Sequence, residues 1–148
     1  MKAPFLLGRL VFGGFFLYSG IHHFLDRKML SQYAAAKKVP MPDLAVVASG
    51  TMMIMGGASI LSGVKPKLGT LAIMGFLAGV SPVIHDFWSH QDPNQRQAEM
   101  VNFTKNLALL GGALALMGVE EPWPMSVPVA QPNALQRVRR FTRRKVAA

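Results

Sequence analysis

Four long apolar blocks, separated by short polar breaks, limit what this 148-residue chain can fold into. The blocks cover approximately residues 4–25, 43–64, 68–88 and 99–119. A helix needs about 20 apolar residues to cross the hydrocarbon core of a bilayer, and each block provides that length. The sequence therefore predicts an all-α integral membrane protein, with a four-helix bundle formed by residues 1–119.

The composition excludes several other classes of protein. Apolar residues make up 51% of the chain and charged residues only 16%, whereas an ordinary soluble domain has roughly 25% charged residues. These values exclude a disordered chain, a collagen and a charged coiled coil. The chain has no cysteine, which excludes a disulfide framework, an iron–sulfur cluster, a thiolate zinc site and a cysteine nucleophile.

The net charge of +9 is concentrated at the C-terminal end. Residues 120–133 contain four prolines and are expected to form an extended linker, with Trp123 as an anchor at the membrane interface. Residues 134–148 form a basic tail. The tail could be solvated and only set the topology, lie as a helix on anionic lipids, or dock a cytoplasmic-side subunit. Nucleic acid is not the expected partner. The basic residues of the tail are Arg137, Arg139, Arg140, Arg143, Arg144 and Lys145.

The distribution of lysine and arginine predicts the topology. An even number of spans places both termini on one side of the membrane. That side has ten basic residues, and the loops on the other side have five. The positive-inside rule therefore places both termini in the cytoplasm of a bacterial-type inner membrane. Arg9, near the start of the first span, is expected to snorkel to the interface.

The sequence contains an internal repeat. Residues 56–64 and 111–119 are identical at six of nine positions, and the first and third blocks resemble each other more weakly. We therefore expect two tandem helical hairpins that form a parallel repeat, related by an axis along the membrane normal. The glycines of the repeat would let neighbouring helices approach closely.

Polar residues gather at the outward ends of three spans. Two histidines end the first span, a His-Asp pair ends the third, and Glu99, Asn102 and Asn106 share one face of the fourth. Lys105 would lie below the outer headgroups unless it snorkels. Polar residues in a span usually face the bundle interior or a watery cavity, so these positions form the candidate site: His22, His23, His85, Asp86, Asn102, Lys105 and Asn106.

Several roles are open for this set. His22, Asp86, Lys105 and Asn106 could bond to one another and simply close the outer end of the bundle. The histidines could instead hold a quinone headgroup, with Asp86 exchanging protons. Histidine and carboxylate ligands could also bind a divalent metal or a haem, but no spacing here matches such a signature and we assign no metal. No cofactor is firmly implied, and a quinone is the one that these residue types would suit.

Several motifs, in the same order along the chain, resemble the DoxX family of membrane proteins. The resemblance covers about residues 8–118 and implies a small four-span protein. Other members of the family are linked to a terminal quinol oxidase, to a thiosulfate:quinone oxidoreductase and to oxidative-stress systems. The fourth-span motif implies that Lys105 and Asn106 share the role of that motif in the family. The motifs are Gly8-Arg9-Leu10, Phe16-Leu17-Tyr18-Ser19-Gly20-Ile21, Val39-Pro40-Met41-Pro42, Ser49-Gly50, Gly56-Gly57 and Phe103-Thr104-Lys105-Asn106 through Gly111-Gly112.

Three functions are consistent with the sequence. The first is a small accessory subunit of a larger respiratory or photosynthetic electron-transfer complex, without catalytic activity of its own. The second is a quinone-interacting component of a membrane oxidoreductase, with its site at the outward ends of spans one, three and four. The third is a small transporter. The lipid bilayer is the expected partner in every case, and other membrane subunits are expected in the first.

Overall fold

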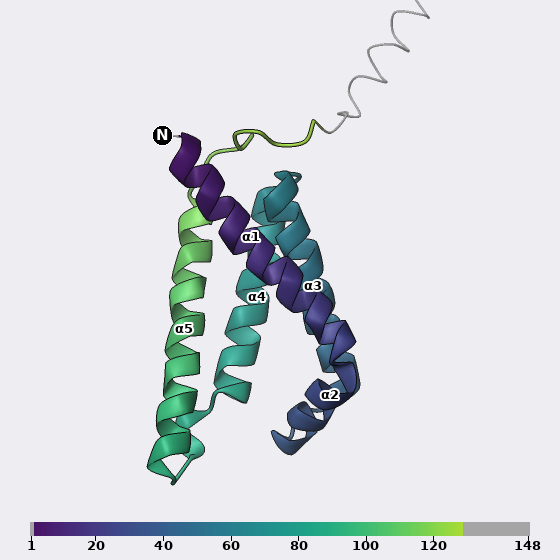
Figure 1. Ribbon diagram of the computed structural model, residues 1–148, viewed down its shortest axis with the longest axis vertical. Helices are drawn as coiled ribbons and strands as arrows, with labels where there is room; N and C mark the ends of the chain where they lie inside the picture. Colours follow the sequence, from purple (N-terminus) through teal and green to yellow (C-terminus); the bar gives the residue numbers. More distant parts are fainter. Residues whose placement is uncertain (1, 129–148) are drawn as a thin grey trace, which may run out of the picture.

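The computed structural model describes residues 2–128, and these form only helices, turns and loops. The elements are α1 (Lys2–Leu25), α2 (Arg27–Ala36), α3 (Pro42–Ser62), α4 (Pro66–Ile84), the short 3-10 helix η1 (Phe87–Ser89) and α5 (Pro93–Met117) (Figure 1). Four of them are long and apolar enough to cross a membrane. The prediction of an all-helical membrane bundle with four spans is confirmed.

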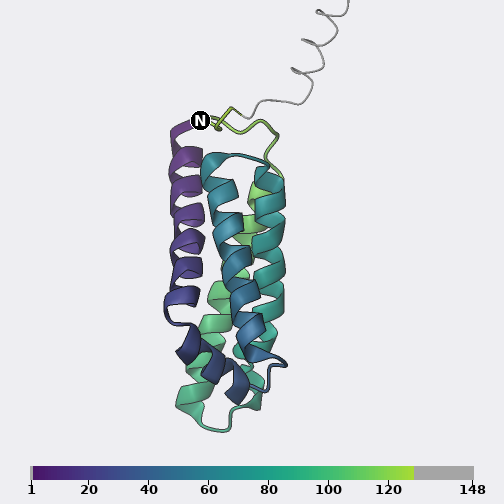
Figure 2. The ribbon, with the colours of Figure 1, turned by 90° about the vertical axis from the view of Figure 1, so that its right-hand side faces the viewer.

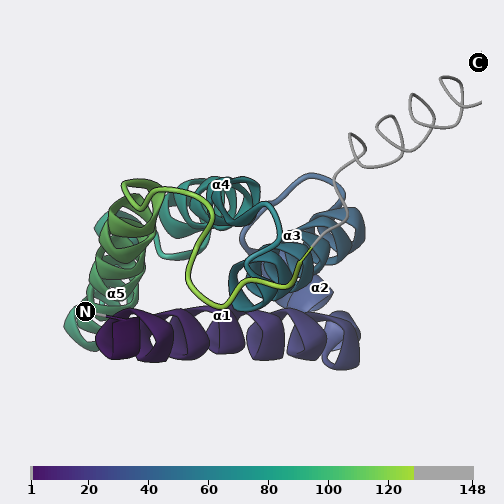
Figure 3. The same cartoon turned by 90° about the horizontal axis from the view of Figure 1, so that it is seen from above.

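The long helices form a bundle in chain order. Helix α1 packs on α3, α3 on α4, and α4 on α5. Helix α1 crosses the others obliquely (Figure 1), and from above it lies along one side of the bundle (Figure 3). The N-terminus and the segment after α5 lie at one end, here called the terminal end. Helix α2 and the η1 loop lie at the other, here called the α2 end (Figure 2).

Prolines mark where helices begin, and they explain part of the difference from the predicted spans. Helices α3, α4 and α5 each begin at a proline, because the first turn of a helix has no partner for its N–H groups. Helix α5 begins at Pro93, six residues before the predicted span. Helix α4 contains Pro82 and ends at Ile84, shortly after the proline removes a backbone hydrogen bond.

Glycines bring the helix backbones into contact. A Cβ atom built on Gly57 of α3 would lie 2.6 Å from the backbone nitrogen of Leu17 and 2.7 Å from the carbonyl oxygen of Gly13, both in α1. On the adjacent face of α3, a Cβ on Gly56 would lie 2.9 Å from the carbonyl oxygen of Gly69 in α4. No side chain fits at either position, so small residues determine how closely three of the four spans pack.

The repeated glycines have different surroundings in the two hairpins. A Cβ on Gly111 of α5 would meet nothing within 4 Å, and one on Gly112 would lie 3.4 Å from the ring of Phe12. Only 6% of the apolar stretch of α5 is buried, against 22–33% for the other spans. The second hairpin is therefore packed more loosely than the first, although the sequences match.

The segment that follows α5 turns back over the terminal end of the bundle instead of extending away from it. Trp123 is 2% exposed and packs edge-on against Phe5, with the ring centroids 5.3 Å apart. The backbone N–H of Val127 donates to the carbonyl oxygen of Ser62 at 2.8 Å. Trp123 therefore belongs to the core of the bundle and does not project as an interface anchor. The basic tail residues from Arg137 onward lie outside the described residues.

Arg9 is buried, at 4% exposure, and does not snorkel as expected. Its guanidinium donates to the carbonyl oxygens of Pro124 at 2.7 Å, Leu61 at 2.9 Å and Met125 at 3.2 Å. Leu61 lies in the last turn of α3, where the helix dipole is negative and favours a cation. Arg9 thus ties α1, the end of α3 and the returning segment together.

Helix α2 lies where the sequence suggested only a loop. Leu30, Tyr33 and Ala34 have the i, i+3, i+4 spacing of one helix face, and Ala34 is buried against α3. The polar side of α2 is also fixed, because Arg27 Nε donates to Asp43 at 2.7 Å and Ser31 Oγ donates to it at 3.1 Å. The first span is therefore followed by a short amphipathic helix that covers one end of the bundle.

The close contact at Gly57 leads to a first prediction. We expect Gly57→Ala to lower the free energy of unfolding by about 1–3 kcal/mol, because the added methyl group must push the α1 backbone away. Gly14→Ala is the matched control, since a Cβ there meets nothing within 4 Å and alanine favours helix by about 0.5–1 kcal/mol. Unfolding of the purified protein in detergent measures both. Equal effects of the two substitutions would contradict the packing described here.

Candidate functional site

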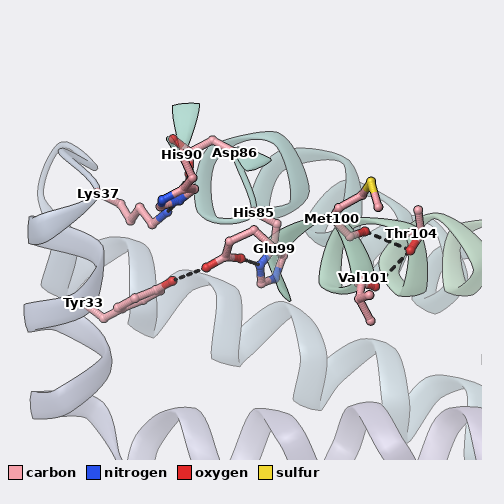
Figure 4. A network of polar contacts seen from close by, with 9 residues as sticks. All are labelled: Tyr33, Lys37, His85, Asp86, His90, Glu99, Met100, Val101 and Thr104. Carbon is pink, nitrogen blue, oxygen red and sulfur yellow. Dashed lines mark hydrogen bonds and ion pairs between the residues drawn. The ribbon is translucent and has the colours of Figure 1, made fainter. Parts of the chain in front are cut away.

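The α2 end contains a carboxylate that joins three helices. The hydroxyl of Tyr33 in α2 donates to Glu99 Oε1 at 3.3 Å, and His85 Nδ1, at the end of α4, lies 2.7 Å from Glu99 Oε2 (Figure 4). Glu99 belongs to α5. We call these three residues the Glu99 bridge. The bridge holds the α2 helix over the ends of α4 and α5.

A second group of charges lies beside the bridge. Lys37 Nζ donates to Asp86 Oδ1 at 2.5 Å and lies 3.2 Å from His90 Nε2 (Figure 4). The His90 Nε2 atom is 3.6 Å from the same carboxylate oxygen. The three side chains are only 14–25% exposed. This Lys37 cluster fastens the end of α2 to the loop that follows α4.

The surroundings of Tyr33 and Lys37 raise the pKa of both side chains, so both keep their hydrogen-bonding protons to higher pH. Burial, and then the charge of Glu99, raise the pKa of the Tyr33 hydroxyl. Burial alone would lower the pKa of Lys37, but the hydrogen bond to Asp86 and the neighbouring negative charges outweigh it, and the pKa rises above its usual 10.5. The stabilising contribution of Lys37 is therefore fully present at neutral pH and is lost only as the pH rises through that raised value.

A cavity of about 440 Å³ lies beneath α2, between α1, α3 and α4. Its walls are almost entirely apolar, with Ala34, Val46 and Val80 among the lining residues. A Cβ on Gly79, which also lines it, would meet nothing within 4 Å. We call this space the α2 cavity. Four polar side chains line it: His23, Tyr33, Ser49 and His85.

The structure divides the predicted site residues between several places. His23 and His85 line the α2 cavity, and Asp86 pairs with Lys37 nearby. The Nδ1 atom of His22 lies 3.1 Å from the carbonyl oxygen of Tyr18, in its own helix. His22 does not line this cavity. The two histidines of the first span thus have different surroundings.

The predicted residues of α5 lie apart from that cavity. Asn106 lines a smaller cavity of about 220 Å³ between α4 and α5. Asn102 is half-buried, and Lys105 is exposed on α5. Within residues 2–128, neither side chain makes a hydrogen bond or ion pair. His22, Asp86, Lys105 and Asn106 therefore do not bond to one another, and Tyr33, Lys37 and Glu99 close the α2 end instead. Among the described residues, no group of three potential ligands could hold a metal ion.

Sequence reasoning missed Tyr33, Lys37 and Ser49. It placed Glu99 on the polar face of the fourth span but did not include it among the candidate site residues. The signal for Tyr33 was the i, i+3, i+4 spacing of Leu30, Tyr33 and Ala34, which predicts an amphipathic helix in a segment otherwise read as a polar loop. Lys37 was considered only as one of the basic residues whose distribution predicts the topology. No local pattern distinguishes Ser49 from a serine that packs between helices, because the cavity it lines is formed by other elements.

The Lys37 cluster leads to a prediction about the mobility of α2. We expect Lys37→Met to speed amide hydrogen exchange in α2 about fivefold, which corresponds to the loss of roughly 1 kcal/mol from one hydrogen bond. Lys38→Met is the matched control, because Lys38 is exposed and its side chain bonds to no described residue. Exchange that is unchanged in the Lys37 variant, or equally fast in both variants, would contradict the anchoring role.

Comparison with known proteins agrees with this architecture. A family model described as DoxX matches residues 5–86, a range that runs from α1 to Asp86 and is more than half of the chain. The α5 residues Lys105 and Asn106 lie beyond that match. Searches of curated proteins and of solved structures gave no match. On the family match, and on four helices long and apolar enough to span a membrane, this multi-pass membrane protein belongs to the DoxX family.

Proposed function

We propose that this protein binds an amphipathic small molecule of the quinone type in the α2 cavity, as the quinone-interacting component of a membrane oxidoreductase. The observation that supports the proposal is a mainly apolar cavity with two histidines and a tyrosine in its lining. The sequence alone placed the accessory-subunit function first. The cavity favours the small-molecule function, because an accessory subunit that only packs between other subunits needs no cavity of this size.

The size and chemistry of the cavity suit such a ligand. Small-molecule sites have volumes of roughly 300–1,000 Å³, mostly apolar walls and a few polar groups that orient the ligand. The α2 cavity has a volume of about 440 Å³, which is enough for one aromatic headgroup and the start of its tail. Val46 and Val80 offer apolar surface for the ring, and His23 and His85 offer polar contacts from two different helices.

The proposed orientation places this cavity toward the outer face of the membrane. Both termini would lie in the cytoplasm of a bacterial-type inner membrane, as the excess of basic residues at that end predicts. The headgroup would then bind near the outer interface, beneath α2, and its apolar tail would extend toward the bilayer. The Glu99 bridge and the Lys37 cluster would separate the headgroup from water on the outer side.

A second function, accessory subunit of a larger electron-transfer complex, is supported by α5. This helix is the least buried of the four spans. Lys105 lies near its middle, is exposed, and has no hydrogen-bond or ion-pair partner within residues 2–128. A lysine ammonium facing lipid is costly, so a neighbouring subunit with an acceptor at that depth would stabilise it. The two functions are compatible, since an oxidoreductase component also needs partner subunits.

If the α2 cavity binds a quinone, a larger side chain that fills the cavity should lower the amount of quinone bound. Protein purified from membranes in mild detergent should contain bound quinone, measured by extraction and mass spectrometry. We expect Gly79→Leu to lower the occupancy about tenfold, since even 1.4 kcal/mol of steric overlap costs a factor of ten. Gly111→Leu adds the same side chain to an open face of α5 and should leave the occupancy unchanged. Equal occupancy in the two variants, or no quinone in the wild-type protein, would contradict the proposal.

The accessory function predicts that Lys105 affects assembly and not ligand binding. We expect the wild-type chain to migrate with a large complex in native electrophoresis of detergent-solubilised membranes. Lys105→Leu should shift most of the chain to the free form, whereas Lys105→Arg, which keeps the charge, should remain assembled. A wild-type chain that migrates only as a free protein would rule out this function.

A further inference from the structure

We infer that the α2 cavity recognises a headgroup that donates hydrogen bonds, and so prefers the hydroxyl-bearing form of an aromatic ring, such as a hydroquinone or a phenol, over the corresponding carbonyl form. The inference rests on the proposed function and identifies the class of ligand for that same site. It follows from the hydrogen bonds that the four polar lining residues already make, because each of these residues donates its proton to an acceptor within the protein.

His23 presents an acceptor. Its Nδ1 atom lies 3.0 Å from the carbonyl oxygen of Ser19, one turn earlier in α1. A carbonyl oxygen can only accept, so Nδ1 must hold the proton. In a neutral imidazole the other ring nitrogen, Nε2, then has a lone pair and no hydrogen. The atom that remains available to a ligand is thus an acceptor.

His85 has the same arrangement with a stronger partner. Its Nδ1 atom lies 2.7 Å from the carboxylate oxygen Oε2 of Glu99, which again accepts and so fixes the proton on Nδ1. In the neutral imidazole the free Nε2 atom is an acceptor. A carboxylate bonded to one nitrogen of an imidazole fixes the tautomer and the orientation of the ring, so Glu99 is a positioning residue for His85.

The two hydroxyl groups are committed in the same way. Tyr33 donates its proton to Glu99 Oε1 at 3.3 Å, and Ser49 Oγ donates to the carbonyl oxygen of Val46 at 3.0 Å. Each hydroxyl oxygen keeps only lone pairs for further contacts. With both imidazoles neutral, every polar side chain that lines the cavity therefore offers acceptors and no free donor.

An acceptor-only lining discriminates between the two forms of a ligand ring. A quinone has two carbonyl oxygens that need donors, and in this cavity they would stay unpaired, which is costly inside an apolar space. A hydroquinone of the same shape has two hydroxyl groups that can donate to the imidazole and hydroxyl acceptors. The preference arises without any change in the shape of the cavity.

The test compares three ligands of similar shape on the purified full-length protein in detergent. The probes are a decyl-substituted 1,4-hydroquinone, the corresponding quinone, and the dimethyl ether of the hydroquinone, which has no hydroxyl proton. We expect the hydroquinone to bind about tenfold or more tightly than each of the others, since two hydrogen bonds distinguish them. Equal affinities that fall together in Gly79→Leu would overturn this inference and leave the proposed function intact. No binding of any probe would overturn both.

The adjacent histidines provide a matched pair of variants. His23→Leu should weaken hydroquinone binding about tenfold and change the affinity for the dimethyl ether less than about twofold, since only the hydroxyl form uses the lost acceptor. His22→Leu should change neither affinity. Equal weakening of both ligands by His23→Leu would mean that His23 acts only by packing and would overturn its assigned role. Ser49→Ala, a smaller change, should also weaken only the hydroquinone.

Nitrogen-15 NMR of labelled histidine provides a readout that does not depend on affinity. At pH 8 we expect both His23 and His85 to show a protonated Nδ1 and an unprotonated Nε2. Hydroquinone should shift the Nε2 signals, and the dimethyl ether should not. Histidines with the proton on Nε2 would present donors to the cavity and would overturn the inference.

Discussion

The contact between the backbones of α1 and α3 determines most of the rest of this structure. Gly57 allows α3 to lie directly against α1, and Gly56 on the adjacent face allows α4 to approach as closely. Once these three helices are fixed, the short connection after α1 must fold back over α3, where α2 forms. The α2 cavity is the space that remains between α2, α3, α4 and the last turn of α1. Its position thus follows from glycines that lie elsewhere in the bundle.

The polar residues near that cavity illustrate a general constraint on membrane proteins. Inside a bilayer, water does not satisfy polar groups, so a hydrogen-bond partner in the protein stabilises a polar side chain there. Here the partners of His23, Tyr33, Ser49 and His85 are all acceptors. These hydrogen bonds lower the cost of placing the polar side chains beside an apolar cavity. They also occupy the protons of those side chains, which then have none to donate to a ligand. Stability and the proposed ligand preference therefore have one physical origin.

Residue patterns predicted the four spans, because the length and hydropathy of a segment can be read from the local sequence and decide whether that segment can cross a bilayer. They also placed His85 and Asp86 at the end of a span, near the part of the bundle where the cavity lies. They did not predict that Arg9 and Trp123 are buried, because both depend on the chain returning over the terminal end after α5. They did not predict that Lys105 lies apart from His85, because the rotation of α5 about its axis depends on packing that a weak amphipathic pattern does not define.

The burial of Arg9 has a consequence for how the protein is made. Its three acceptors belong to Leu61, Pro124 and Met125, and two of these are among the last of the described residues to leave the ribosome. Until they arrive, the first span enters the membrane with a guanidinium that lacks its final partners. The first helix can therefore settle in its native position only after residues 124 and 125 have been synthesised, and a chain shortened before residue 124 would leave a buried cation without two of its acceptors at the terminal end of the bundle.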